Sequence, residues 1–223
     1  MDLLTNFNDI SVIDVAIGIL SSLAVIFLTM PIHEAAHAYV ATKLGDPTPR
    51  YAGRLSLNPF NHIDYMGALC IILFGFGWAK PVQVNPRNFD NAKRGMALTA
   101  FAGPLSNILL ATVSVTVNML LLKISIVTQL EIIYYISIFF YYIAVINVSL
   151  AVFNLIPIPP LDGSRLLSAF LPDRIYYKLM QYERYFYFGL IILIVSGSLD
   201  GVLSTINFKI MEVISFLPGI ILF

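Results

Sequence analysis

Residues 12–44, VIDVAIGILSSLAVIFLTMPIHEAAHAYVATKL, carry two histidines and a glutamate within a stretch that is otherwise almost entirely apolar. Between Ile10 and Lys43 the only other charged residue is Asp14. Because an ionisable group in a membrane helix costs about 2.5–3.5 kcal/mol on insertion, its presence there indicates a function. The stretch is long enough to cross the hydrocarbon core of a bilayer, which is about 30 Å thick. Pro31 lacks a backbone donor and predicts a kink near the middle of this helix.

The whole chain has the composition of a membrane protein. Of its 223 residues, 58% are hydrophobic and 12% are charged, whereas soluble domains contain about 25% charged residues. The apolar segments leave no soluble domain over, so residues 1–223 are predicted to form one membrane-embedded domain, with a core at 12–170 and C-terminal helices at 171–223. A formal net charge of zero argues against a nucleic-acid-binding surface. Cys70 is the only cysteine, so the chain can form neither an intrachain disulfide nor a cysteine-rich zinc site.

Hydropathy predicts an all-α polytopic membrane protein with four transmembrane helices. The predicted spans cover about residues 12–44, 95–122, 130–155 and 185–203. Residues 206–223 are apolar but carry two charged residues and Pro218, which is consistent with either a fifth crossing or an interfacial helix. The segment at 173–188 mixes basic residues with tyrosines, which is typical of a chain that enters the membrane through the aromatic belt.

Two shorter segments are predicted between the first and second spans. Residues 53–59, GRLSLNP, alternate polar and apolar side chains and predict a short membrane-associated β-hairpin. Residues 67–78, GALCIILFGFGW, are apolar but short and interrupted by glycine. They predict a re-entrant segment that is shielded by protein and does not cross the bilayer.

The distribution of positive charge predicts the orientation, because loops rich in Lys and Arg remain in the cytoplasm. Of the 13 Lys and Arg residues, only Lys123 and Lys209 lie outside the connections from span one to span two and from span three to span four. We therefore expect a multi-pass protein of a bacterial-type cell membrane, with the N-terminus outside and both basic loops in the cytoplasm.

Residues 33–37 read HEAAH, a spacing that places His33 and His37 on one face of a helix with Cβ atoms about 5–6 Å apart. One zinc ion can reach both imidazoles. A catalytic zinc takes three protein ligands and leaves one position open for water. H-E-x-x-H is a zinc-protease pattern in which the glutamate, here Glu34, is the general base. The third ligand is predicted to be Asp162, which follows the proline break at the cytoplasmic end of the third span.

The topology constrains this assignment, because His37 and Asp162 can share a metal only if an even number of crossings separates them. The second and third spans supply two crossings. A full crossing by residues 67–78 would make the number odd. The metal site and the charge distribution therefore independently require a re-entrant segment there.

Five motifs succeed one another along the chain. They are HEAAH at 33–37, GRLSLNP at 53–59, FGFGWAKPVQVNP at 74–86, FAGPLSN at 101–107 and NLIPIPPLDG at 154–163. In this order they resemble the site-2 protease family of intramembrane zinc metalloproteases. The similarity covers about residues 20–170 and points to the minimal type, without PDZ or CBS domains.

The resemblance implies a function and roles for particular residues. It implies that His33, His37 and Asp162 hold one Zn²⁺ per chain. It also implies that Glu34 is the catalytic base and that Asn154 lines the site. The expected reaction is hydrolysis of peptide bonds within transmembrane segments of membrane-protein substrates, as in regulated intramembrane proteolysis.

A substrate helix must unwind locally before it is cut, and the extended segment then needs new backbone partners. Strand addition to a sheet edge could provide them. The candidate edge consists of Arg54, Leu55, Ser56, Leu57 and Asn58, and a purely structural hairpin is the alternative.

Three further polar residues have alternative interpretations. Asn107 lies in an apolar span, where it could stabilise an oxyanion, contact substrate or hydrogen-bond a neighbouring helix. Asn154 lies at the end of the third span and could line the site or serve the fold alone. His62, the remaining histidine, is predicted to have a structural role in an interfacial loop.

Two other functions compete with proteolysis. A zinc transporter would use the same histidines as a conduction site, but its polar residues should be spread across the bilayer, whereas the strong ligands here gather near one side. An inactive scaffold that binds transmembrane helices would not need a complete set of ligands and base. Cleavage of a reconstituted membrane peptide distinguishes these functions.

Overall fold

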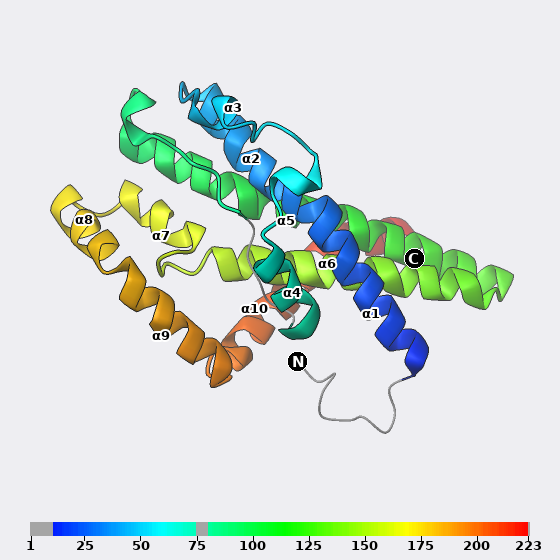
Figure 1. Cartoon of the computed structure of the whole chain (residues 1–223). Coiled ribbons are helices and arrows are strands. Elements are labelled where there is room, and N and C mark those ends of the chain that lie inside the picture. Colours follow the sequence, from blue (N-terminus) through cyan, green and yellow to red (C-terminus); the bar gives the residue numbers. More distant parts are fainter. Residues whose placement is uncertain (1–10, 75–79, 223) are drawn as a thin grey trace.

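The computed structural model describes residues 11–74 and 80–222, and within these residues every regular element is a helix (Figure 1). The α-helices are α1 (Val12–Ala24), α2 (Met30–Lys43), α3 (Thr48–Tyr51), α4 (Tyr65–Phe74), α5 (Ala92–Thr128), α6 (Glu131–Asn154), α7 (Asp162–Leu166), α8 (Asp173–Gln181), α9 (Glu183–Val195) and α10 (Asp200–Leu222). Three segments, Val12–Lys43, α5 and α6, are long and apolar enough to cross a membrane. This confirms the prediction of an all-α polytopic protein. Figure 1 shows α5 and α6 side by side, with α1 and α2 crossing over them.

The first span is a long helix that contains a π-helical turn, Val25–Thr29, between α1 and α2. The N–H of Met30 bonds the carbonyl of Val25, five residues back, and the hydroxyl of Thr29 donates to the same carbonyl (3.1 Å). Pro31 comes at once in the first turn of α2, where its missing N–H interrupts the α-helical hydrogen bonds. The break predicted at Pro31 is thus a local widening of the helix, a feature frequently found at functional sites.

Small side chains let α5 and α6 pack closely. Their buried contact contains Ala111, Val115, Ala144, Val148 and Val152. Such residues allow two helix backbones to approach one another in a membrane, where van der Waals contact drives association. Nδ2 of Asn118 in α5 donates to the carbonyl of Ser137 in α6 (2.8 Å), which fixes the antiparallel register of the pair.

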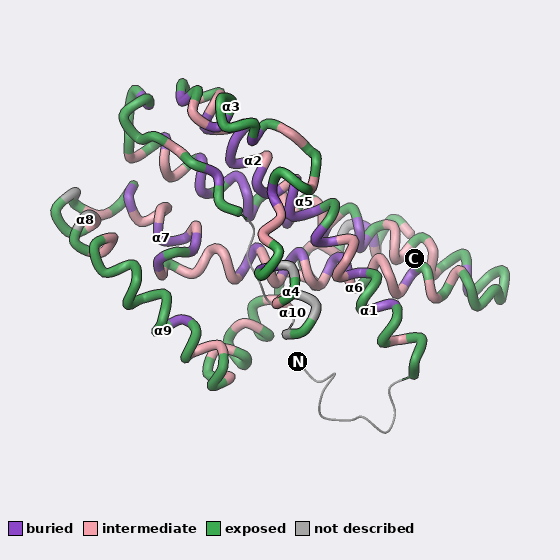
Figure 2. Tube along the Cα trace, viewed as in Figure 1, coloured by how far each residue is buried: buried purple, intermediate pink, exposed green. Residues whose placement is uncertain are grey.

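The predicted fourth span at 185–203 does not form one continuous helix. Helix α9 ends at Val195, and Gly197 adopts a left-handed conformation (φ 67°) in the turn that leads to α10. The two helices are bent by 83° and can count together only as one broken span. The 13 residues of α9 extend about 20 Å, which is short of the hydrocarbon core. Figure 2 shows that α9 is largely exposed, whereas buried residues concentrate where α2 meets α5.

The C-terminal residues belong to α10, a 23-residue helix that packs along α5 and α6. Nδ2 of Asn207 donates to Oγ of Ser149 in α6 (3.0 Å). Near the other end of α10, the ammonium group of Lys123 in α5 donates to the carbonyl of Leu222. The helix therefore runs antiparallel to α6.

The segment that contains α4 begins and ends at the same place in the fold, at His62 and Lys80. Helix α4 has only 10 residues, too few to cross a bilayer. The backbone N–H of Lys80 donates to the carbonyl of His62 (2.8 Å). Both ends of the excursion thus lie together, as a re-entrant segment requires. Residues 75–78 of the predicted segment lie outside the described residues.

No strand forms at 53–59 in the part of the chain that the structure describes, so the predicted β-hairpin is not observed. Arg54 is buried, and its guanidinium donates to the carbonyl of Asn61. Nε2 of the buried His62 lies 2.6 Å from the carbonyl oxygen of Ser56. Side chains therefore satisfy backbone groups of this loop in place of a partner strand. The alternation in the sequence separates a buried from an exposed side of a loop.

The buried carboxylate of Asp46 fixes the loop after α2. It accepts hydrogen bonds from the N–H and hydroxyl of Thr48 (3.1 and 2.6 Å), from the N–H of Asn85 (2.7 Å) and from Nδ2 of Asn88 (2.6 Å). Burial raises the pKa of Asp46, but these hydrogen bonds outweigh burial and lower the pKa below its usual value. Asp46 thereby ties the end of α2 to the segment that leads into α5.

We expect Asp46→Asn to reduce the free energy of unfolding at neutral pH by about 1–3 kcal/mol, because an amide cannot accept all these hydrogen bonds. A carboxyl whose pKa is lowered by folding stabilises the protein above its unfolded pKa of about 3.9. The difference from wild type should therefore be lost as the pH falls through the lowered pKa of folded Asp46. Thermal unfolding in detergent between about pH 7 and about pH 3 measures it. The exposed carboxyl at Asp90 provides the control, Asp90→Asn; equal effects of the two substitutions would contradict the expectation.

Candidate metal centre

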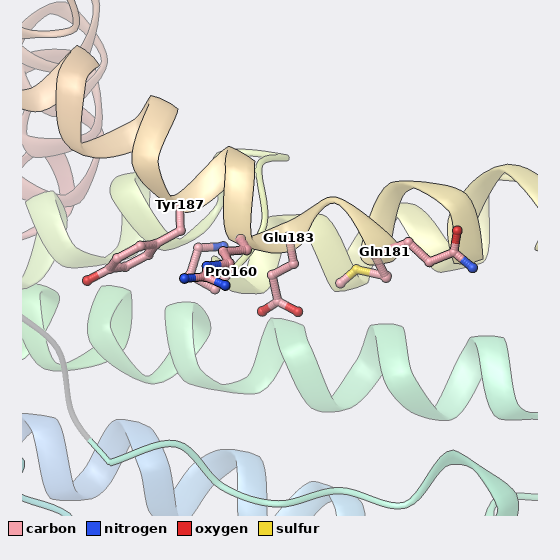
Figure 3. A pocket seen from close by; sticks show the side chains of 6 residues that line it. Pro160, Gln181, Glu183 and Tyr187 are labelled. Atoms are coloured by element: carbon pink, nitrogen blue, oxygen red, sulfur yellow. The ribbon is translucent and has the colours of Figure 1, made fainter.

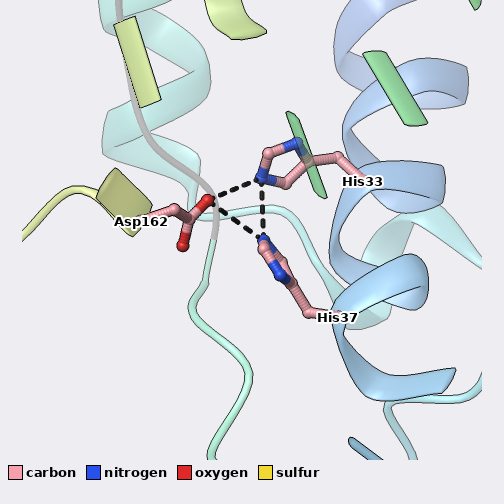
Figure 4. A group of neighbouring side chains, drawn as sticks. All are labelled: His33, His37 and Asp162. Atoms are coloured by element: carbon pink, nitrogen blue, oxygen red, sulfur yellow. Dashed lines mark hydrogen bonds and ion pairs between the residues drawn. The ribbon is translucent and has the colours of Figure 1, made fainter. Parts of the chain in front are cut away.

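Two imidazoles lie together where α2 packs against α5. His33 and His37 are 8% and 7% exposed, and their Nε2 atoms are 3.0 Å apart (Figure 4). Nδ1 of His37 lies 2.7 Å from the carbonyl oxygen of Thr99 in α5. A carbonyl can only accept, so this nitrogen carries the hydrogen and Nε2 presents its lone pair to the site.

Asp162 faces the two histidines across the site (Figure 4). Its Oδ2 lies 3.4 Å from Nε2 of His33 and 3.2 Å from Nε2 of His37. The backbone folds tightly over the end of α6 here, because a Cβ atom at Gly163 would lie only 2.3 Å from the carbonyl oxygen of Leu155. The glycine in the LDG sequence thus lets α7 begin at Asp162 and directs its carboxylate toward α2.

The three side chains fit a zinc ion. Nitrogen and carboxylate oxygen ligands lie about 2.0–2.2 Å from a tetrahedral zinc, which puts them about 3.3–3.6 Å from one another. The separations here are 3.0, 3.2 and 3.4 Å. Two imidazoles and one carboxylate also form a donor set of catalytic zinc sites. Within the described residues, His33, His37 and Asp162 are the only group of three or more His, Cys, Asp or Glu side chains that could hold a metal.

Helix α5 shapes the site through Gly103, a residue that the interpretation of the sequence did not single out. A Cβ atom at Gly103 would lie 2.3 Å from Nε2 of His37 and 2.6 Å from Cε1 of His33, distances that real Cβ atoms essentially never show. Only glycine therefore allows α5 to cover both rings. The available signal was a glycine beside Pro104 inside an apolar helix, which is unfavourable unless close packing requires it.

The other predicted site residues are not members of this cluster. Glu34 is next to His33 in α2 and is buried, with 9% exposed. Asn107 is buried in α5, one helical turn beyond Gly103. Asn154 is the half-buried last residue of α6. The candidate edge and His62 belong to the segment between α3 and α4.

A hollow of about 430 Å³ lies beside the segment that leads from α6 to the metal centre (Figure 3). Its walls come from Pro160 and from the junction of α8 and α9. The lining residues are Pro160, Met180, Gln181, Glu183, Arg184 and Tyr187. None of the three clustered residues lines it, so the hollow is distinct from the metal centre.

A bundle of membrane-crossing helices that brings an HExxH pair and an aspartate to one buried point defines a membrane-embedded protein with a zinc-peptidase type of site. The model of "Peptidase family M50" matches residues 21–196. The chain therefore belongs to peptidase family M50, the site-2 protease family.

Two curated relatives are similar over most of the chain. "Putative zinc metalloprotease YwhC" of Bacillus subtilis is 36% identical over 171 residues, which are 77% of this chain and 78% of the relative. "Putative zinc metalloprotease Rip2" of Mycolicibacterium smegmatis is 25% identical over 178 residues, which are 78% of this chain and 66% of the relative. No solved structure matches the chain at a significant level.

We expect Gly103→Ala to reduce bound zinc to well below one ion per chain, because the added methyl group would occupy the space of the imidazole edges that face the metal. Elemental analysis of the purified protein measures the zinc content. Gly189→Ala in α9 is the control, since a Cβ atom there meets nothing within 4 Å. A full complement of zinc in Gly103→Ala would contradict the close contact of α5 with the two histidines.

Proposed function

We propose that the protein is an intramembrane zinc metallopeptidase that hydrolyses peptide bonds within transmembrane segments of membrane proteins. The observation that carries the proposal is the convergence of His33 and His37 with Asp162 at one buried point beside the membrane-crossing helices. Membership of peptidase family M50 supports it, as do the names of the two relatives, which both contain zinc metalloprotease. Residues 1–223 would act as a single protease domain, with Asn154 lining the site.

His33, His37 and Asp162 would hold one zinc ion. Bound zinc would polarise the scissile carbonyl and lower the pKa of a bound water to about 7. The carbonyl of Thr99 keeps the hydrogen of His37 on Nδ1, so that Nε2 faces the ion. Glu34 would accept a proton from the attacking water and pass it to the nitrogen of the leaving amine. Its burial and its place within the same turn of α2 as the first histidine support this role.

The arrangement of the loops supports an orientation with the metal centre toward the cytoplasmic side and the N-terminus outside. The ammonium group of Lys93, in the first turn of α5 directly after the first basic connection, donates to the carbonyl of Leu171, which lies beyond α7 (3.1 Å). The two connections that contain most of the Lys and Arg residues therefore meet at one end of the bundle. By the positive-inside rule this end would face the cytoplasm. Water could then reach the metal from the nearer side of the membrane.

We further propose that the loop at 54–58 offers its backbone to the unwound substrate. Arg54 and the carbonyl of Ser56 bond within the loop, whereas the alternating Leu55 and Leu57 are 42% and 68% exposed. Within the part of the chain that the structure describes, no hydrogen bond engages the main-chain groups of these two leucines. In an extended segment, the backbone N–H and C=O groups of alternate residues point to the same side. Those of Leu55 and Leu57 could therefore pair with an added strand.

Glu34→Gln should retain one zinc per chain but lower the cleavage rate at least about 100-fold, because proton transfer by a positioned carboxylate contributes about 10²–10⁴-fold. Cleavage of a labelled transmembrane peptide in proteoliposomes measures the rate, and a chelator and then added zinc test the metal requirement. Glu131→Gln, at the exposed start of α6, should cleave at the wild-type rate. A fully active Glu34→Gln variant would overturn the assignment of the base.

Leu57→Pro removes the N–H that an added strand would use and should slow cleavage more than Leu57→Ala, with zinc content unchanged in both variants. The same order is expected for proline and alanine at Leu55. The peptide assay in proteoliposomes compares the four variants. Equal rates for proline and alanine at both positions would reject the loop as a backbone partner of the substrate.

A further inference from the structure

The two histidines differ in the environment of their second ring nitrogen. Nδ1 of His37 bonds the carbonyl of Thr99. Nδ1 of His33 is buried, and the described residues offer it no hydrogen-bond partner. Figure 4 shows this nitrogen turned away from Asp162. Histidine ligands of metals almost always donate this second hydrogen to a carbonyl, a carboxylate or water, so His33 needs an acceptor that the described residues do not supply.

Two buried amides on adjacent helices need a donor. Oδ1 of Asn107 in α5 and Oδ1 of Asn147 in α6 are buried and find no partner among the described residues, although Nδ2 of Asn147 donates within its own helix (2.9 Å). The hydrogen bond between Asn118 and Ser137 sets the register of these antiparallel helices. Asn107 lies eleven residues before Asn118 in α5, and Asn147 lies ten residues after Ser137 in α6. Because the helices are antiparallel, these similar separations place Asn107 and Asn147 at about the same depth. Unsatisfied amide oxygens at one depth of a membrane bundle are costly and point to a shared donor.

The packing of α5 brings Asn107 toward His33. A Cβ atom at Gly103 would lie 2.6 Å from Cε1 of His33, so this glycine contacts the ring. Asn107 lies one helical turn beyond Gly103 in the direction of the membrane interior, and i and i+4 positions share a helix face. The amide is therefore placed on the side of α5 that faces α2.

The packing of α6 brings Asn147 to the same junction. Ile146 and Leu150 pack against the cluster of buried residues that includes Met30 at the start of α2. Met30 lies one turn before His33. Asn147 lies between these two α6 residues in the sequence and is fully buried. We therefore expect the three polar groups to face the junction of α2, α5 and α6.

We propose that a resident water molecule occupies this junction and connects the three groups. It would accept the Nδ1 hydrogen of His33 and donate its own two hydrogens to Oδ1 of Asn107 and of Asn147. Three hydrogen bonds are typical of a buried water. The water holds the ring of His33 as the carbonyl of Thr99 holds that of His37, which makes Asn107 and Asn147 positioning residues. The inference rests on the proposed zinc site and assigns Asn107 a role other than oxyanion stabilisation.

Zinc affinity, measured by competition with a chelator, tests the proposal. Asn107→Leu and Asn147→Leu should each weaken zinc binding about 10-fold, because loss of the partner of a metal-bound histidine typically costs 10–100-fold. The double variant should lose little more than either single variant, since each substitution removes the same water. Losses that multiply in the double variant, or unchanged affinity in both single variants, would overturn the proposal.

Asn207→Leu is the matched control. Oδ1 of Asn207 is likewise buried without a partner among the described residues, but Asn207 lies on α10, where it bonds Ser149. This variant should bind zinc as wild type does. In spectra of ¹⁵N-histidine-labelled protein, the Nδ1 resonance of His33 should shift in the two test variants and stay unchanged in the control. An equal shift or an equal loss of affinity in Asn207→Leu would show a general effect on the fold and reject the water.

A high-resolution structure of the zinc-loaded wild type does not depend on how the variants fold. It should contain an ordered water within about 3.2 Å of Nδ1 of His33. A structure with zinc but without this water would overturn the inference and leave the proposed metal centre intact. A wild-type protein that binds no zinc would contradict the proposed function and, with it, this inference.

Discussion

The close approach of α5 to α2 at Gly103 is the contact on which the metal centre depends. Lipid offers no hydrogen-bond partner to an imidazole or a carboxylate, so protein must enclose these groups. Gly103 lets α5 cover both rings, and Thr99 on the same helix orients His37. Helix α5 also packs against α6, whose end determines where Asp162 emerges. The positions of all three candidate ligands therefore depend on the packing of one helix against two neighbours.

The polar loops hold together the segments of the chain that leave and return to the same end of the bundle. Asp46 connects the end of α2 to the segment before α5 through hydrogen bonds to Asn85 and Asn88. The carbonyl of His62, before α4, accepts a hydrogen bond from the N–H of Lys80, after α4. Lys93, in the first turn of α5, donates to the carbonyl of Leu171 in the second basic connection. Because these excursions begin and end at one side of the bundle, the chain can return to the histidines after two crossings. Membrane topology and metal chemistry thus impose the same constraint.

The candidate ligands could be predicted from the sequence because ionisable groups stand out in apolar helices, and the three long spans could be predicted for the same reason. The absence of the hairpin could not be predicted from the sequence. An alternation of polar and apolar residues fits a strand, but it also fits a loop with one buried side, as the hydrogen bonds of Arg54 and Ser56 show. The break between α9 and α10 near Gly197 was not predicted, because hydropathy is averaged over a window of residues and does not report the backbone conformation of one residue. The roles of Gly103 and Thr99 depend on contacts between helices distant in the sequence.

The π turn before Pro31 joins the two halves of the first span. In α1, the hydroxyl of Ser21 bonds the carbonyl of Phe139 in α6 (3.2 Å), whereas in α2 the histidines face Gly103 of α5. Each residue added to a helix rotates the remainder of that helix by about 100°, and the wider turn takes up one residue without breaking the rod. The spacing between Ser21 and the HEAAH sequence is therefore restricted as well. An insertion or deletion there would leave all three candidate ligands present but would turn His33 and His37 away from Asp162.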